Sequence, residues 1–309
     1  MYFPYLRGRQ NELLALKVLL DNSKLSEKII PIIEPVKLSP TLNIVIKAFN
    51  EKIRRIAIIK NPQVGLFIKD LRDKDNPKVE SFLSEMKKDN IIKAIFVNNS
   101  FRQKINKLID KNNDLHSIIT ICNDINYLSN DYILYSKEFL YNIIPYDLDF
   151  DDIDGNRVLH DDKFNKQARN TDYSLKDDEF FSKDHLIYSK FGYIGFCDYS
   201  IVGQKYDDSG FAPYAVAIHI VYFDDSKKLR IKHFVSDSNN DISDPAKKFY
   251  EAVSKLVEWK QETNYDTLGL SEFERLYSTK SYPGLGYVKK LSIMHHLELI
   301  SKYLDGEIK

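Results

Sequence analysis

Residues 91–121, IIKAIFVNNSFRQKINKLIDKNNDLHSIITI, are the stretch that decides the fold class. Two isoleucine-rich runs, Ile91–Val97 and Ile118–Ile121, have the length of buried strands and flank a segment over 100–112 whose apolar residues follow helical spacing. A strand, a helix and a second strand in this order make a βαβ unit, and repeated βαβ units build a parallel sheet.

The alternation extends to both sides of this stretch. Helices are predicted from Asn11, over 41–54 and over 77–88, and the further predicted strands are Ile29–Ile33, Ile56–Ile59, Leu66–Ile68, Tyr132–Tyr135 and Asn142–Tyr146. Right-handed crossovers place the helices outside the strands. We therefore predict a TIM-barrel-like α/β fold, a (β/α) barrel with an added β-hairpin and C-terminal helices. An open parallel sheet is the alternative, because some units lack a helix.

The second half changes character. Residues 147–185 are rich in Asp, Asn and Lys and indicate an irregular insertion, which either carries function or is only solvated. Residues 186–309 then indicate a β-hairpin followed by a helical C-terminal part. The strands expected there are Tyr193–Val202, Tyr214–Phe223 and Leu229–Val235, and two or three helices are expected around 244–260, 271–279 and 288–304. We expect 1–309 to form a single barrel-like domain.

Composition limits the class of protein. The chain has 309 residues with 43% hydrophobic content, enough for a large buried core, and its 45 basic and 45 acidic side chains balance. A dedicated nucleic-acid binder usually has a basic excess, which is absent overall, although a local basic groove is not excluded. Two distant cysteines, a start without the pattern of a signal peptide and the absence of a long apolar run predict a cytoplasmic protein with no membrane segment.

The predicted hairpin yields a specific inference about two histidines. Its apolar faces match only if Phe223 opposes Leu229 and Val221 opposes Ile231, a register that places His219 opposite His233. Facing imidazoles can bind a metal, relay a proton or share a buried hydrogen-bond network. Core histidines satisfied by backbone groups are the alternative, and no cofactor or metal is specified by the sequence.

The strand before the hairpin carries a carboxylate. In Tyr193–Val202, Asp198 alternates onto the face of Ile194 and Phe196, and Tyr199 lies on the other. A buried Asp is costly unless it is paired or functional. If its face is also that of His219, an Asp–His–His cluster forms; otherwise Asp198 caps a turn.

Polar residues also follow the strands of the first half. Arg7 comes after the first strand and Glu34 after the second, so the two are expected to be neighbours at the carboxyl edge of a barrel, where such folds carry their sites. They form either a ligand clamp or a structural ion pair. Lys69–Asp70, Asn98, Asn123–Asp124 and Asp147 are at further strand ends.

Inside the insertion, Phe164 and Tyr173 can anchor the chain while Arg169 and Asn170 face a partner. An arginine binds phosphate or carboxylate through two parallel hydrogen bonds, although Arg169 can equally neutralise the acidic residues around it. No HExxH, P-loop, GxSxG or GxGxxG pattern occurs, so the common enzyme motifs are absent.

The motifs taken together resemble a known family. YFPYLRGRQNELLAL with IIPIIEPV, GFCDYSIVG, PYAVAIHIVY, SIMHHLELI and DKFNKQARNTDY are similar, over nearly the whole chain, to the bacterial and phage "beta protein" family and to a bacterial branch of it. Members often occur near mobile elements and defence genes, so the resemblance implies a role in anti-phage defence. It implies no established activity.

Two functions follow as hypotheses. In the first, the chain is a recognition or adaptor protein for an effector encoded by a neighbouring gene, which its 20 tyrosines and 18 phenylalanines favour because aromatic residues anchor interfaces. In the second, it is a barrel-type, metal-assisted hydrolase acting on a phosphodiester or nucleotide. Its catalytic residues would be Glu34, Asp198, His219 and His233, with substrate contacts from Arg7, Arg169, Asn170, Tyr173 and Tyr199.

Overall fold

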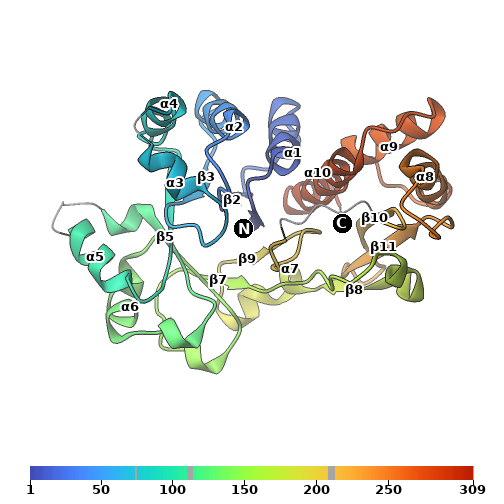
Figure 1. The fold of residues 1–309 in the computed structure, drawn as a ribbon. Helices are drawn as coiled ribbons and strands as arrows, with labels where there is room; N and C mark the ends of the chain where they lie inside the picture. Colours follow the sequence, from blue (N-terminus) through green and yellow to red (C-terminus); the bar gives the residue numbers. More distant parts are fainter. Residues whose placement is uncertain (74, 110–113, 208–212, 309) are drawn as a thin grey trace. The chain divides into compact units, whose positions relative to one another are not determined.

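Parallel strands closed into a ring form the centre of the first part of the chain. The computed structural model describes residues 1–73, 75–109, 114–207 and 213–308. Within them, the ring has the order β1-β2-β3-β4-β5-β6-β7-β9 and every neighbouring pair is parallel (Figure 1). The strands are β1 Tyr2–Leu6, β2 Ile32–Ile33, β3 Ile56–Ile59, β4 Ile91–Phe96, β5 Ile118–Ile121, β6 Tyr141–Ile144, β7 Arg157–His160 and β9 Gly195–Asp198. The predicted TIM-barrel-like fold is confirmed, and the open sheet does not form.

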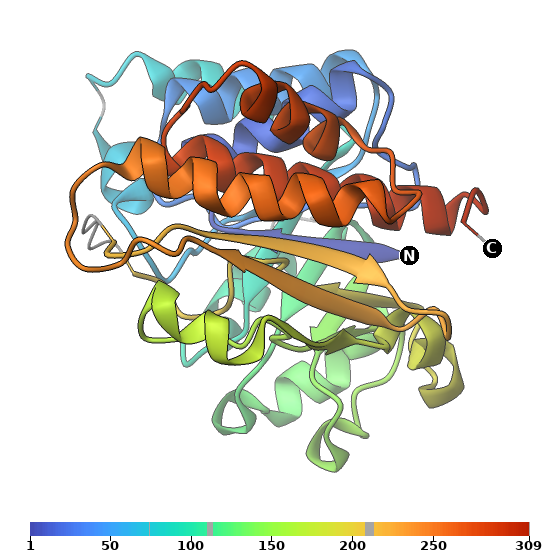
Figure 2. The same ribbon diagram turned by 90° about the vertical axis from the view of Figure 1, so that its right-hand side faces the viewer.

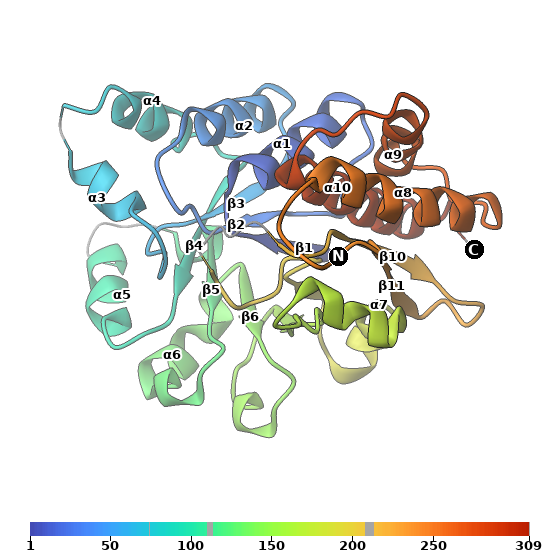
Figure 3. The ribbon, with the colours of Figure 1, turned by 45° about the vertical axis from the view of Figure 1, so that its right-hand side comes forward.

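Helices between these strands lie outside the ring, as the crossover rule requires (Figure 3). They are α2 Pro40–Glu51, α3 Phe67–Arg72, α4 Lys78–Glu85, α5 Phe101–Ile109, α6 Asn130–Tyr135 and α7 Asp184–Ile187. Short 3₁₀ turns accompany them: η1 Leu115–Ser117, η2 Ile125–Tyr127, η3 Ser136–Glu138, η4 Leu148–Phe150 and η6 Tyr188–Phe191. The end of the helix predicted over 100–112 lies outside the described residues.

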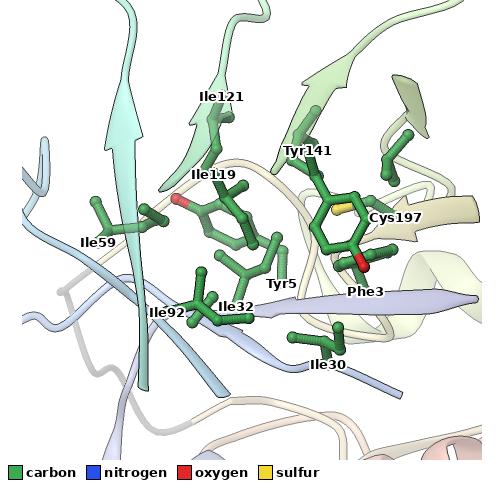
Figure 4. Close-up of a cluster of buried hydrophobic side chains, with 14 of the residues drawn as sticks. Phe3, Tyr5, Ile30, Ile32, Ile59, Ile92, Ile119, Ile121, Tyr141 and Cys197 are labelled. Carbon is green, nitrogen blue, oxygen red and sulfur yellow. The ribbon is translucent and has the colours of Figure 1, made fainter. Parts of the chain in front are cut away.

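The lumen of the barrel is a packed core. Alternate residues of each strand point inward, among them Tyr5, Ile32, Ile59, Ile92 and Ile119 (Figure 4). All five side chains are at most 5% exposed. The isoleucine-rich runs therefore form strands because each has one set of side chains for the lumen and another for the surrounding helices.

The chain divides into two compact units. The barrel unit contains Met1–Gln10, Glu27–Asp162 and Asp184–Tyr199, and the second unit contains Asn11–Ser26, Lys163–Lys183 and Ser200–Lys309. Helix α1 Gln10–Asp21, which follows the first barrel strand in sequence, thus belongs almost entirely to the second unit.

The second unit contains an antiparallel sheet of order β10-β11-β8. Its strands are β8 Asp178–Ser182, β10 Ala217–Phe223 and β11 Leu229–Val235. The same unit contains η5 Asn170–Lys176 before β8, and the helices α8 Pro245–Gln261, α9 Leu268–Ser278 and α10 Leu285–Leu304 after β11. Helices α8 and α10 run beside the β10–β11 hairpin (Figure 2). Trp259 of α8 contacts Tyr222 and Phe234 of the sheet. The predicted hairpin is confirmed, and of the two or three C-terminal helices expected, three form.

Two predicted strands are wrong. Leu66–Ile68 enters α3, and Tyr132–Tyr135 is the end of α6. The Ser129 side chain accepts a hydrogen bond from the Tyr132 backbone N–H, so a helix cap converts a short apolar run into a helical turn. Such a short run does not distinguish helix from strand by periodicity alone.

Residues 147–185, expected to be irregular, contain β7 and β8. Strand β7 pairs with β6 and β9 and is required for barrel closure, while β8 pairs with β11. Among the described residues, no helix is long and apolar enough to cross a membrane.

Candidate functional site

The carboxyl end of the barrel brings a cation and a carboxylate together. Arg7 directly follows β1 and Glu34 directly follows β2, and these parallel strands pair with Leu6 beside Ile33. The Arg7 guanidinium forms an ion pair with the Glu34 carboxylate. The prediction that these two residues are neighbours is confirmed.

Glu34 is fully buried and accepts three hydrogen bonds. Its Oε2 accepts from Arg7 Nη1 and from the Tyr5 hydroxyl at 2.7 Å, and its Oε1 accepts from the Gln63 backbone N–H at 2.7 Å. Burial raises the pKa of the Tyr5 hydroxyl well above its ordinary value, and the charge of Glu34 adds to this rise. Three donors converge on one buried carboxylate and satisfy its oxygens. This arrangement favours a structural ion pair over a ligand clamp.

Aromatic rings surround the guanidinium. Its Cζ atom lies 5.2 Å from the centroid of the Tyr5 ring and 5.4 Å from that of Tyr199. The ring of His160, at the end of β7, lies 5.1 Å from Tyr199 and 6.2 Å from Tyr5, centroid to centroid. Burial raises the pKa of Tyr199, so both phenols stay protonated beside the arginine at neutral pH.

Sequence reasoning missed His160 as a member of this cluster. Its strand, Arg157–His160, has only two aliphatic residues and lies in an acidic, amide-rich context. The signal that was available is the Gly155-Asn156 turn in front of it.

Asp198 is the last residue of β9, and its carboxylate is hydrogen-bonded within the barrel unit. Its Oδ1 accepts a hydrogen bond from the Tyr2 hydroxyl at 2.8 Å, and both residues are buried. Tyr2 and Asp198 lie on paired strands, since Pro4 is beside Asp198 in the register of β1 and β9. The hydroxyl provides the partner that a buried carboxylate requires.

The histidine pair forms as the register predicts. His219 of β10 opposes His233 of β11, flanked by the pairs Val221–Ile231 and Ala217–Val235. Their Nδ1 atoms are 2.8 Å apart, a distance that requires one ring to donate and the other to accept. His233 Nε2 lies 3.5 Å from Glu179 Oε1 on β8.

Both imidazoles are neutral at neutral pH. Burial lowers the pKa of His219 well below its usual range, and the positive charge that His233 would carry lowers it further. Burial also lowers the pKa of His233, outweighing the opposite effect of Glu179. A chain of donors from His219 to His233 and on to Glu179 satisfies every contact without a second proton on either ring.

Tyr173 anchors the inserted segment on this pair. Its ring centroid lies 4.6 Å from that of His219 and 4.7 Å from that of His233, and Phe164 also packs against His219 at 5.1 Å. The Tyr173 hydroxyl accepts a hydrogen bond from the Gln167 backbone N–H at 3.0 Å. The imidazoles and aromatic rings thus hold 164–176 against the sheet.

A cavity of about 700 Å³ adjoins the anchored segment. We call it the Arg169 groove; it is lined by Arg169, Asn170, Thr171, Pro213, Tyr214, Ala215, Asn239 and Ile242. Asn170 Nδ2 donates to the Ala215 carbonyl at 2.8 Å and joins the two sides. Tyr214 and Ile242 are 57% and 54% exposed. Within the described chain Arg169 forms no ion pair.

The predicted site residues fall into two sets. Arg7, Glu34, Asp198 and Tyr199 belong to the barrel unit; Arg169, Asn170, Tyr173, His219 and His233 belong to the second unit. The combination of both sets in one mouth stays a prediction. Over 1–73, 75–109, 114–207 and 213–308, no three His, Cys, Asp or Glu side chains are arranged to hold a metal ion.

Fold and clusters define the class of protein: a TIM-barrel-like α/β protein with a second unit that displays an open groove. Comparisons with models of protein families, with curated proteins and with solved structures find no match.

Proposed function

We propose that this chain is a recognition protein, which binds an acidic, partly apolar segment of a partner protein in the Arg169 groove. In keeping with the family resemblance, the partner is an effector encoded by a neighbouring gene in a prokaryotic anti-phage or mobile-element defence module. The two buried, free cysteines, Cys122 and Cys197, are consistent with the cytoplasm as its compartment.

The Arg169 groove is the observation that carries the proposal. Exposed tyrosine, isoleucine and arginine side chains gather around a cavity, and tyrosine and arginine are the residues that most often dominate binding energy at interfaces. The only charged side chain that lines it among the described residues is Arg169, which selects an acidic group on the partner.

The architecture behind the groove supports a binding role. Tyr173, buried against two neutral imidazoles, fixes the segment that carries Arg169, and the Asn170–Ala215 hydrogen bond fixes the opposite side. A surface held in place before the partner arrives loses less conformational entropy on binding.

The hydrolase alternative has less support. Glu34, Asp198, His219 and His233 each form a hydrogen bond with a side chain of their own unit. Glu34, Asp198 and His233 are also buried, each at most 3% exposed, which leaves little of these side chains for a substrate to contact. We therefore favour recognition over catalysis.

The test measures binding between the full chain and the products of its neighbouring genes by co-expression and calorimetry. Arg169→Ala with Tyr214→Ala is expected to weaken the binding of the partner by about 1,000-fold, since two interface anchors of about 2 kcal/mol each are lost. The matched control is Lys166→Ala with Leu175→Ala, an exposed cation and an 85%-exposed apolar residue of the same segment, which is expected to change affinity less than about threefold.

Charge reversal sharpens the test. Arg169→Glu should bind more weakly than Arg169→Ala, because it repels the acidic group of the partner, and reversing that group should restore binding. No binding by the unmodified chain, or equal losses in the groove and control variants, would contradict the proposal.

A further inference from the structure

The barrel unit contains a cavity that the proposed function does not use. It has a volume of about 760 Å³ and is lined by Arg55, Lys60, Leu83, Met86, Lys87, Lys88, Asp89, Ile91, Ile92, Lys93, Ser117 and Leu140. Many of these residues directly precede or begin barrel strands, since Arg55 precedes β3, Ser117 precedes β5 and Leu140 precedes β6. The cavity therefore opens near the amino ends of the strands. We call it the lysine cavity.

The lining of this cavity carries an excess of positive charge. Five of the lining side chains are cationic, and Asp89 is the only carboxylate among them. Within the described chain, none of the five forms an ion pair, although other lysines do, such as Lys17 with Asp21 and Lys137 with Asp154. Like charges confined to one concave surface attract an anion from solution.

Two of the lysines are in positions where the fold does not call for a charge. Lys93 lies in the middle of β4 between inward-facing Ile92 and Ala94, so its side chain faces the outer layer of the barrel. Its partner in the register of β3, Ile58, is fully buried. An aliphatic residue would suit that outer position, and a lysine there gives up hydration.

The pKa of Lys60 reflects its burial and its closeness to Lys93. Lys60 follows β3, its ammonium lies 5.6 Å from the ring centroid of Phe82, and its backbone N–H bonds to the Ala94 carbonyl of β4. Burial lowers the pKa of Lys60, and the neighbouring charge of Lys93 lowers it further. Among the described residues neither Lys60 nor Lys93 forms an ion pair, so an anionic ligand would supply the missing partner.

Helix electrostatics account for only part of the cluster. Lys87 and Lys88 come just after α4, where cations complement the negative end of the helix dipole. This explanation does not extend to Lys93, which lies in β4, or to Arg55 and Lys60, which precede and follow β3.

The rest of the lining indicates the size and nature of the ligand. Leu83, Met86 and Leu140 add an apolar wall, and the volume falls in the range of cavities that bind small molecules. Phosphate is an anion that both lysine and arginine side chains commonly bind.

We propose that the lysine cavity binds a small phosphorylated molecule of nucleotide size, with its phosphates at Lys60, Lys93 and Arg55 and its organic part against Leu83 and Met86. Apart from Lys60, the lining residues lie away from the carboxyl ends of the strands, which supply the catalytic residues of parallel barrels, so we assign a binding site rather than a reaction centre. The proposal is independent of the Arg169 groove, because the two cavities share no residue.

The test is a calorimetric titration of the full chain with ATP and, separately, with inorganic triphosphate, both in the presence of EDTA. ATP is expected to bind more tightly than triphosphate, because only ATP offers a ring to the apolar wall. Lys60→Gln with Lys93→Gln should weaken ATP binding at least tenfold. The matched control, Lys47→Gln with Lys69→Gln, removes the same charge from exposed helix positions of the barrel unit and should stay within about twofold of the unmodified chain.

Thermal unfolding without ligand provides a second readout. The Lys60→Gln, Lys93→Gln variant should melt at the same or a higher temperature, since it relieves repulsion, whereas a purely structural role predicts a lower one. Absence of ATP binding, equal affinity for triphosphate and ATP, or equal losses in the test and control variants would overturn the proposal. Binding of a single-stranded oligonucleotide but not of ATP, lost in the same variant, would also overturn it and assign the cavity to nucleic acid.

Discussion

The barrel mouth and the hairpin of the second unit both bury ionisable side chains, and they do so by opposite means. At the mouth, Arg7 and Glu34 keep their charges and neutralise each other, with added donors from Tyr5 and Gln63. At the hairpin, His219 and His233 bury two groups of the same potential charge, and both must stay neutral. The stability of the first arrangement depends on the presence of every hydrogen-bonding partner, and the stability of the second depends on pH.

The largest effect is expected at the mouth. Glu34→Ala leaves the Arg7 guanidinium buried without its carboxylate and should lower the free energy of unfolding by about 3–5 kcal/mol. Denaturant titration followed by far-ultraviolet circular dichroism measures this. Glu51→Ala, which breaks a 3.8 Å pair with Lys47 between side chains that are 65% and 64% exposed, is the control and should cost at most about 0.5 kcal/mol. Equal losses in the two variants would contradict the contrast.

The hairpin cluster should come next. Tyr173→Ala removes the ring that covers both imidazoles and should cost about 3 kcal/mol. The single tryptophan, Trp259, packs on the same sheet and reports unfolding of the second unit by its fluorescence. Leu175→Ala, at an exposed position of the same segment, should be nearly silent. A Tyr173→Ala variant as stable as the control would show that the cluster does not anchor the segment.

A glycine beside the mouth tests how tightly the carboxylate is enclosed. Gly65 has a φ of +76°, and an added Cβ would lie 2.1 Å from the Val36 carbonyl oxygen, two residues after Glu34. Gly306 has a φ of +81° with open space around it. Both Gly→Ala changes cost about 1 kcal/mol through backbone conformation, and Gly65→Ala should cost at least about 1 kcal/mol more because backbone must shift. Equal melting temperatures of the Gly65→Ala and Gly306→Ala variants would contradict the larger cost expected at Gly65.

The smallest effect is expected in how the free energy of unfolding depends on pH. The folded imidazoles have pKa values below the unfolded value of about 6.5, so the unfolded chain binds more protons below that pH. Stability attributable to the pair is therefore complete above about pH 6.5 and is lost as pH falls toward the lowered pKa values. His219→Gln should flatten this slope by up to about 1 kcal/mol per pH unit. His295, whose burial lowers its pKa to about 4, contributes equally to both chains and cancels. Parallel slopes in the two chains would contradict the prediction.

Sequence patterns predicted the parts of the fold that depend on alternation. Ile56–Ile59 and Ile118–Ile121 form strands over the predicted bounds, and the facing histidines follow from matching two apolar faces. Side-chain period fixes such a register, because a slip by one residue would turn every buried side chain outward.

The rest depended on tertiary contacts that no local pattern reveals. Strand β7 and its His160 were missed because the strand is four residues long and is stabilised by neighbours on both sides in the barrel. The lysine cavity was likewise invisible, because Lys60 and Lys93 are distant in sequence and meet only through the pairing of β3 and β4.

Closure of the ring joins the two ends of a long stretch of chain, since Tyr2 pairs with Phe196. At a ribosomal rate of roughly 5–20 residues per second, the first strand waits on the order of ten seconds or more before its partner β9 is made. During that time its edge hydrogen-bonding groups are exposed to other nascent chains. The barrel thus cannot close before β9 has been made, and we expect its yield in cells to depend on chaperones that shield this edge.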